Sequence, residues 1–414
     1  MSDSYRVYGY RWVVLAVVML VNLTIQMLWI SFAPITSTSA AYYGVSDVAI
    51  GALAMSFMIV FIPLSLPAAW LIDTRGFRLA VGLGVVLAAV FGIARGLAGA
   101  NYTLVLIFTI GIAVGQPFLL DAWTKVGANW FAARQRATAV SLITLASMLG
   151  IAVGMALTPV LAESMSIANV QLLYGLLAAA AAVAFLVLAR ERPASPPCPP
   201  GMDERALMLD GLKHALTVKP FLVLLVLAFF VMSTFNGVTT WVEQIIEPRG
   251  FSTTEAGTMG ALMLVAGVIG AVVLSALSDR QGKRVRFIVI GLLAAIPGLL
   301  GVTFATSAIV LYLSAAELGF FVVAILPLGM QYAAEVTRPT PEGTSNGLIQ
   351  LCGQVSVAYV YVMAALRLSN GSFTVSLLLS AALLGALAVV MSRLTEHAVA
   401  PAPAPATRAG EAAP

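Results

Sequence analysis

Long apolar runs recur along the chain, separated by short polar segments. We count about twelve, at residues 12–35, 48–71, 79–99, 102–127, 137–161, 168–189, 220–246, 255–277, 287–304, 307–335, 345–366 and 373–392. Each is close to the roughly 20 residues that an α-helix needs to cross about 30 Å of hydrocarbon. The pattern therefore predicts an all-α membrane protein with twelve transmembrane helices. The first run is too long for a signal peptide and lacks a small-residue cleavage site, so we expect it to remain as the first span.

A polar segment divides these runs into two sets of six. It contains the Pro-rich stretch from Pro193 to Pro200 and then a mixed-charge stretch, Met202 to Leu216, with amphipathic spacing that predicts a short surface helix. The end of the chain is rich in Ala and Pro, which is typical of disorder. We therefore predict an N-terminal six-helix bundle at 1–190, a cytoplasmic linker at 191–218, a C-terminal six-helix bundle at 219–396 and a disordered tail at 397–414.

Composition supports a membrane protein. Hydrophobic residues make up 60% of the chain and charged residues 10%, which is more apolar surface than a globular core of this length could bury. If the N-terminus is cytoplasmic, every basic residue except Arg95, Arg249 and Arg367 falls on the cytoplasmic side or at its membrane edge, as positive-inside sorting requires. We read the net charge of +4 as a consequence of this topology and expect no nucleic-acid partner. The expected location is the cell membrane, as in a bacterial inner membrane, with both termini cytoplasmic.

Two stretches of the chain repeat each other without a gap, at a constant offset of 206 residues. Leu71–Arg78 aligns with Leu277–Arg284, and the same offset pairs Gly44 with Gly250, Gly51 with Gly257, and Thr138 with Thr344. Parallel repeats of this kind are typical of secondary transporters. The repeat predicts two like-oriented halves, each with the same short charged turn between two spans.

In each repeated turn an Asp ends one span, a Gly permits a tight reversal, and basic residues can pair with nearby carboxylates or helix C-termini. This pattern, together with the twelve spans, resembles the signature loop of the major facilitator superfamily. The resemblance implies two six-helix bundles that rock about a substrate site near the bilayer midplane, with the turns latching the cytoplasmic side. Ordinary positive-inside loop charges are the alternative. The gating candidates are Asp73, Arg75, Gly76, Arg78, Asp121, Lys125, Asp279, Gly282 and Arg284.

A narrower resemblance covers most of the transmembrane region. The segments Phe61–Leu64 and Pro67–Gly76, and further on Gly319–Phe321, Leu326–Gly329 and Pro341–Leu348 with Glu335, are similar to motifs of the feline leukaemia virus subgroup C receptor family. That family transports choline and ethanolamine and has been linked to haem export. The resemblance implies that Trp29 and Gln354 help surround a quaternary ammonium. Two positions depart from the family: Met148 replaces a fifth-span glutamine, and Asn236 replaces a seventh-span tyrosine.

The residues themselves support a cationic substrate. An aromatic ring face attracts a cation, and Trp29 lies near the middle of its span. Trp241 is a candidate second wall and Glu243 a nearby negative charge. Trp70, Trp123 and Trp130 lie near cytoplasmic membrane edges and are expected to belong to an aromatic belt, and a belt position on the other side is the alternative for Trp241. Gln116, between Gly115 and Pro117, is a cavity candidate because helix breakers such as Pro34, Pro63, Pro67 and Pro327 interrupt the spans, with plain kinking as the alternative.

Ionisable residues at membrane depth are costly, so each is a functional hypothesis. Glu317, near the middle of the tenth span, is expected to neutralise a cationic substrate, to carry a coupling proton, or to pair with another helix. Asp121 and Lys125 are four residues apart and would share a helix face near the cytoplasm, as an ion pair or as partners of Arg75 and Arg78. Arg95 and Glu243 lie toward the outer ends of their spans, where side chains can snorkel to water.

Nothing in the sequence indicates an enzyme. There is no phosphate-binding Walker loop, and the scattered Cys198, Cys352, His214 and His397 indicate no metal site, disulfide or cofactor. We predict a secondary transporter that moves a small organic cation or amine, choline-like, by alternating access, as a monomer in the lipid bilayer. Two alternatives remain: a transporter of another small organic solute (vitamin, carboxylate or drug) with protons as the coupling ion, and a non-transporting membrane receptor.

Overall fold

The computed structural model describes residues 7–195, 197, 213–338, 340 and 342–395. The part of the chain that it describes is all-helical, and it contains twelve helical segments long and apolar enough to cross a membrane, which confirms the predicted fold class. The predicted surface helix at 202–216 lies mostly outside the described residues, and the tail at 397–414 lies entirely outside them.

Six spans form each half of the molecule. The first half contains α1 Arg11–Ile30, η1 Ala33–Ile35, α2 Thr36–Tyr43, α3 Asp47–Arg75, α4 Phe77–Leu97, α5 Tyr102–Leu120, α6 Trp123–Trp130, α7 Ala133–Ser164 and α8 Ile167–Leu188. The second half contains α10 Lys219–Thr240, α11 Val242–Ile246, η2 Glu247–Arg249, α12 Thr253–Gln281, α13 Arg284–Phe304, α14 Ala308–Val336, α15 Glu342–Val355, α16 Val357–Ala365 and α17 Thr374–Ser392.

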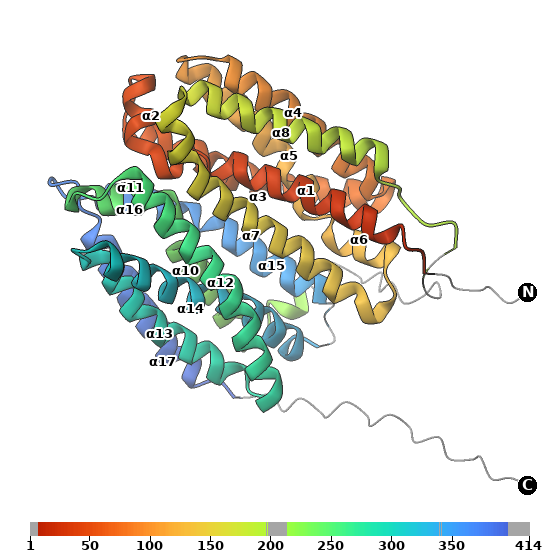
Figure 1. The fold of residues 1–414 in the computed structure, drawn as a ribbon. Helices are drawn as coiled ribbons and strands as arrows, with labels where there is room; N and C mark the ends of the chain where they lie inside the picture. Colours follow the sequence, from red (N-terminus) through yellow and green to blue (C-terminus); the bar gives the residue numbers. More distant parts are fainter. Residues whose placement is uncertain (1–6, 196, 198–212, 339, 341, 396–414) are drawn as a thin grey trace, which may run out of the picture.

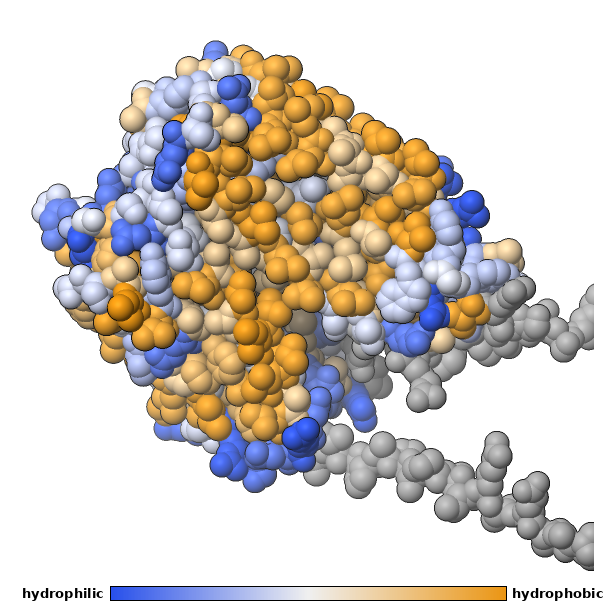
Figure 2. Space-filling view, in the orientation of Figure 1, coloured by the Kyte–Doolittle hydropathy of each residue, from blue (hydrophilic) through white to orange (hydrophobic). Residues whose placement is uncertain are grey.

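The two halves lie beside each other as separate bundles, the first above the second in the view of Figure 1. The repeated turns lie at one end of the molecule, which we call the turn side, and α2 and α11 lie at the opposite end, which we call the far side. On the face shown in Figure 2, apolar side chains cover the middle of both bundles, and polar side chains gather toward the two ends. This distribution matches a multi-pass membrane protein whose middle faces lipid.

The halves meet along α7 and α12. Gly257 of α12 lies so close to α7 that an added Cβ would stand 2.4 Å from the carbonyl oxygen of Met155, which is too near for any side chain. On the far side, three polar links join the halves: the Ser37 backbone N–H donates to Glu243 Oε2 at 3.0 Å, Thr254 Oγ1 donates to Glu163 at 2.9 Å, and Arg367 pairs with Asp47 at 2.8 Å. Ser37 and Glu243 are themselves 206 residues apart, so this link joins equivalent positions of the repeat.

Four of the spans are interrupted. The first breaks at η1, where Pro34 stands, the fourth between Leu120 and Trp123, the seventh at Trp241 and the eleventh at Ser356. Of the prolines expected to interrupt spans, only Pro34 does so, since Pro63, Pro67, Pro117 and Pro327 stand inside continuous helices. Neighbouring helices can satisfy the carbonyl that a proline leaves free, so a proline in a membrane helix need not break it.

Candidate functional site

The turn after α3 is held by a residue that sequence reasoning missed. Gly76 has a φ of +92°, and an added Cβ would stand 2.5 Å from the Glu191 carboxyl carbon, so only glycine fits. Glu191 accepts hydrogen bonds from the backbone N–H groups of Phe77 and Arg78 at 3.2 and 2.7 Å, which places an anion at the N-terminus of α4. Asn129 donates to the same carboxylate at 3.1 Å. The start of the predicted linker is therefore docked on the N-terminal turn.

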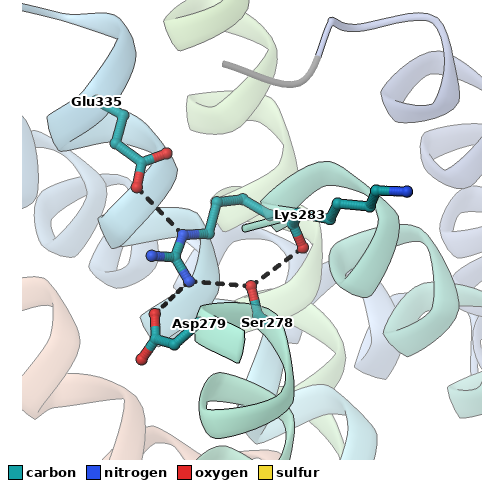
Figure 3. A network of polar contacts seen from close by, with 5 residues as sticks. Ser278, Asp279, Lys283 and Glu335 are labelled. Atoms are coloured by element: carbon teal, nitrogen blue, oxygen red, sulfur yellow. Dashed lines mark hydrogen bonds and ion pairs between the residues drawn. The ribbon is translucent and has the colours of Figure 1, made fainter. Parts of the chain in front are cut away.

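The equivalent turn of the second half is organised around Arg284. Its guanidinium pairs with Glu335 at 3.1 Å and with Asp279, and it donates to Ser278 Oγ at 3.1 Å (Figure 3). The Arg284 side chain is 6% exposed, whereas Asp279 is 64% exposed and Glu335 13% exposed. Gly282 ends α12 with a φ of +64°. The sequence predicted Asp279, Gly282 and Arg284 as gating residues. Glu335, which comes from α14, was named only as part of the family motif and not as a gating residue.

The predicted pair of Asp121 and Lys125 is wrong. The helix is interrupted between Leu120 and Trp123, so the two residues do not share a continuous helical face. Lys125 instead lies 3.7 Å from Asp73 of the N-terminal turn, and Asp121 Oδ2 is buried without a hydrogen-bond partner in the described part of the chain. The partner of Lys125 is therefore the Asp of the repeated turn, and its gating role stays a prediction.

Buried amides line α1 next to the fourth span. Gln116 Nε2 donates to Gln26 Oε1 at 3.2 Å, and the Trp123 indole N–H donates to Asn22 at 2.9 Å. Asn22 and Gln26 are four residues apart on α1, and sequence reasoning named neither as a site residue. Trp29, one turn further along, is buried, and its indole N–H donates to the Ala54 carbonyl of α3 at 3.0 Å. Because this bond fixes the indole, Trp29 has a defined ring orientation.

In the second half, polar side chains meet at the break of the eleventh span. Asn236 of α10 is buried and its Nδ2 donates to Ser356 Oγ at 2.9 Å. Gln354 stands two residues before Ser356, at the end of α15, and is partly exposed. The structure therefore brings Asn236 to the break of the eleventh span, two residues along the chain from Gln354. The helix α15, which carries Gln354, is one of the second-half helices that contact α3 of the first half.

Trp241 and Glu243 occupy the far-side contact. Trp241 is fully buried, donates its indole N–H to the Val360 carbonyl at 3.1 Å and places its ring against Gly51, so it is not a belt residue. Glu243 is 3% exposed and does not snorkel.

Three other predictions from position alone are wrong. Arg95 does not snorkel: it is 1% exposed, donates to the Leu28 carbonyl at 3.1 Å and lies 5.3 Å from the Phe32 ring centre. Trp130 is buried, with its indole N–H on the Arg190 carbonyl at 3.0 Å, and Trp123 is tied to Asn22 inside the bundle. Trp70, by contrast, is exposed as a belt residue would be.

The remaining candidates are isolated. Glu317 is partly exposed on α14 and has no hydrogen bond or ion pair with any described residue. Met148 is partly exposed on α7 and packs against the core. Their roles stay predictions.

Two helical bundles with a repeated charged turn and interrupted spans define a membrane transporter. The family model of the Major Facilitator Superfamily matches residues 15–361 and 245–413. The chain belongs to the Major Facilitator Superfamily and is a transporter rather than an enzyme.

Curated relatives support the narrower resemblance. Solute carrier family 49 member A3 of Xenopus tropicalis is 30% identical over 388 residues, which cover 89% of this chain and 80% of that protein. The choline/ethanolamine transporter FLVCR1 of Felis catus is 29% identical over 370 residues, which cover 83% of this chain but only 65% of that protein. The choline/ethanolamine transporter flvcr2b of Danio rerio is 27% identical, covering 92% and 82% of the two chains.

Solved structures share the fold. A bacterial homolog of the human lysosomal transporter Spinster, in an inward-facing and unoccupied conformation, matches with a TM-score of 0.72 at 15% identity over 93% of this chain and 96% of that one. The human organic anion transporter MFSD10 matches with a TM-score of 0.66 at 15% identity, over 92% and 99%. At this identity the likeness concerns the fold alone.

Proposed function

We propose that this transporter carries a small organic cation or amine, choline-like, by alternating access. The observation that carries the proposal is Trp29: its indole N–H is held by the Ala54 carbonyl, so the ring is fixed in a buried position at the interruption of the first span. A fixed, desolvated ring is the feature that attracts a quaternary ammonium most strongly. Relatives named as choline/ethanolamine transporters support the same substrate class.

The groups around Trp29 suit such a cation. Gln26 and Gln116 on the first and fourth spans are neutral amides, and an amide oxygen can face a positive charge without the desolvation cost of a carboxylate. On the other half, Gln354 and Asn236 lie at the break of the eleventh span. A ligand that touches Trp29 and Gln354 would bridge both bundles, as alternating access requires.

We also propose that the far-side links hold that side closed in this conformation. Glu243 and Trp241 then belong to the closure and not to the substrate contacts, because both side chains are already occupied across the bundle contact. Opening the far side would break the Ser37–Glu243 and Asp47–Arg367 links together. The turns with Asp73 and Asp279 are proposed to latch the opposite side in the alternate state.

The test is uptake into proteoliposomes loaded with the purified full-length protein. Radiolabelled choline and ethanolamine should exchange against unlabelled choline on the other side, whereas vitamins and carboxylates at equal concentration should not compete. Exchange of a carboxylate without competition by choline would contradict the proposal. Failure of every solute to cross, with ligand binding intact, would favour a receptor.

Proton coupling is a second candidate, favoured by two carboxylates without partners. Asp121 Oδ2 is buried and unpaired in the described structure, and Glu317 has no described partner. A carboxylate that can be neutralised by a proton at membrane depth avoids the cost of a buried charge. Glu317→Gln and Asp121→Asn should each be tested for loss of the response of uptake to an imposed pH gradient; if the unaltered protein shows no such response, the transporter is a uniporter.

We propose that the protein lies in the cell membrane with its turn side in the cytoplasm, an orientation that positive-inside sorting supports. We also propose that it is a monomer and that residues 191–218 form the linker between its halves. Labelling of single cysteines in the repeated turns from each side of intact cells tests this orientation.

A further inference from the structure

A groove opens on the outer surface of the N-terminal bundle, at the turn side. Its volume is about 580 Å³, and it runs between the start of α4 and the end of α8. Gly82 forms part of its lining and lacks a side chain, and Leu186 of α8 lies across from it. The groove is therefore a hollow in the lipid-facing surface, separate from the proposed substrate site between the bundles.

The walls of this groove are apolar and exposed. Leu79, Leu83 and Val86 follow one another along α4 at helical spacing, with Leu186 opposite, and these four side chains are between 42% and 50% exposed. Spacing of three or four residues places side chains on one face of a helix. The walls thus form a continuous apolar channel directed along the spans, which suits an acyl chain.

The mouth of the groove carries two exposed arginines, Arg75 and Arg78. Arg75 has no ion-pair partner among the described residues, and Arg78 reaches only the Leu186 carbonyl, at 3.5 Å. Glu191 also lines the mouth, but its oxygens already accept hydrogen bonds from the α4 backbone and from Asn129. Two arginines thus face one carboxylate at the mouth, and that carboxylate is hydrogen-bonded to the α4 backbone and to Asn129.

The repeat explains why Arg78 lies at the surface whereas its equivalent in the second half is buried. Arg78 is equivalent to Arg284 by the 206-residue offset, and Asn129 is equivalent to Glu335. In the second half, Arg284 is buried between Asp279 and Glu335. In the first half, the neutral amide of Asn129 stands where the second half has the Glu335 carboxylate. Asp73, the equivalent of Asp279, pairs with Lys125 instead, so Arg78 lies at the surface.

We propose that this groove binds an anionic phospholipid of the adjacent leaflet, with its phosphate at Arg75 and Arg78 and one acyl chain along Leu79, Leu83, Val86 and Leu186. Arginine suits phosphate because its planar fork donates two parallel hydrogen bonds. The apolar walls favour a lipid over a soluble phosphate, which would gain nothing from them. Because Arg75 and Arg78 belong to the repeated turn, the bound lipid would contact the gating element directly.

Two matched double variants test the proposal. R75Q/R78Q removes two positive charges from the mouth of the groove, and R280Q/K283Q removes two from exposed positions of the equivalent turn in the second half. Binding of phosphatidylglycerol to delipidated, detergent-solubilised protein is measured by native mass spectrometry, with phosphatidylcholine as the neutral comparison. Each basic side chain at an anionic membrane surface contributes about fivefold to binding, so R75Q/R78Q should lose on the order of 25-fold affinity for phosphatidylglycerol.

The control variant R280Q/K283Q should keep its affinity for phosphatidylglycerol within about twofold, as expected when neither removed charge lies at the groove. Phosphatidylcholine should bind all variants alike. A third variant, Gly82→Leu, fills the groove without changing charge, because the Cβ at this position meets Leu186 only at ordinary contact distance, 3.5 Å. It should lower phosphatidylglycerol binding while size-exclusion behaviour stays normal. Equal losses of affinity in both double variants would overturn the site. Binding of glycerol phosphate as tight as that of phosphatidylglycerol would overturn the assignment of the site to a lipid.

Discussion

Replacing Glu335 by glutamine should destabilise the protein more than replacing Asp279 by asparagine, although both carboxylates pair with Arg284. Each substitution keeps the shape of the side chain and removes one negative charge. The difference arises from burial: Glu335 is 13% exposed and lies 3.1 Å from Arg284 Nε, whereas Asp279 is 64% exposed.

The magnitudes follow from these exposures. An exposed ion pair contributes about 0–1 kcal/mol, because water screens it. A hydrogen bond to a charged group that is shielded from water contributes about 1.5–3 kcal/mol. The Arg284 side chain is 6% exposed, so water cannot replace Glu335 as its partner. We expect about 2 kcal/mol for Glu335→Gln and below about 1 kcal/mol for Asp279→Asn, from the same two ranges.

Melting of the purified variants in one detergent, followed by intrinsic tryptophan fluorescence, checks the order. Glu335→Gln should melt at the lower temperature, and 0.5 M salt should reduce only the effect of Asp279→Asn, since exposed pairs are screened and buried pairs are not. The opposite order of melting temperatures would refute the view that burial decides which partner stabilises Arg284.

Three further predictions concern the substrate and the far side. Trp29→Ala should weaken choline binding by about 1–2 kcal/mol, roughly five- to thirty-fold, and Trp29→Phe should weaken it less; calorimetry giving equal affinities would remove the aromatic contact. Glu243→Ala removes the carboxylate that accepts the Ser37 backbone N–H across the two halves, so it should weaken far-side closure. Far-side cysteine labelling should increase in Glu243→Ala, and it should increase less in Glu243→Gln, which keeps an acceptor oxygen for the Ser37 N–H. Gly51→Ala would place a Cβ 2.4 Å from the Trp241 ring and should raise far-side labelling, whereas Gly329→Ala, with 3.9 Å of space, should not.

Local properties of the chain made the fold predictable. Twelve apolar runs gave twelve spans, because lipid offers no partner for a free backbone group and each run must form a helix on its own. The repeat gave both charged turns, since Gly76 and Gly282 adopt positive φ angles that other residues avoid.

Partners distant in sequence were not predictable in this way. Lys125 pairs with Asp73 rather than Asp121, and Glu191 caps α4 from more than a hundred residues away. Sequence position suggested that Arg95 and Glu243 would reach water, yet both are buried against neighbouring helices. The local sequence of one helix does not determine which other helix will pack against it.

The sequence by itself thus determined the number of spans, their grouping into two repeated halves and the places where the chain turns, because these depend on hydrophobicity and backbone conformation within a few residues. Only the tertiary structure decided which charges are neutralised and which remain at the surface. Arg78 and Arg284 occupy equivalent positions of the repeat, but Asn129 lies near one turn and Glu335 contacts the other. The electrostatic environment of a side chain is the sum over all neighbours, and those neighbours are fixed only when the helices pack.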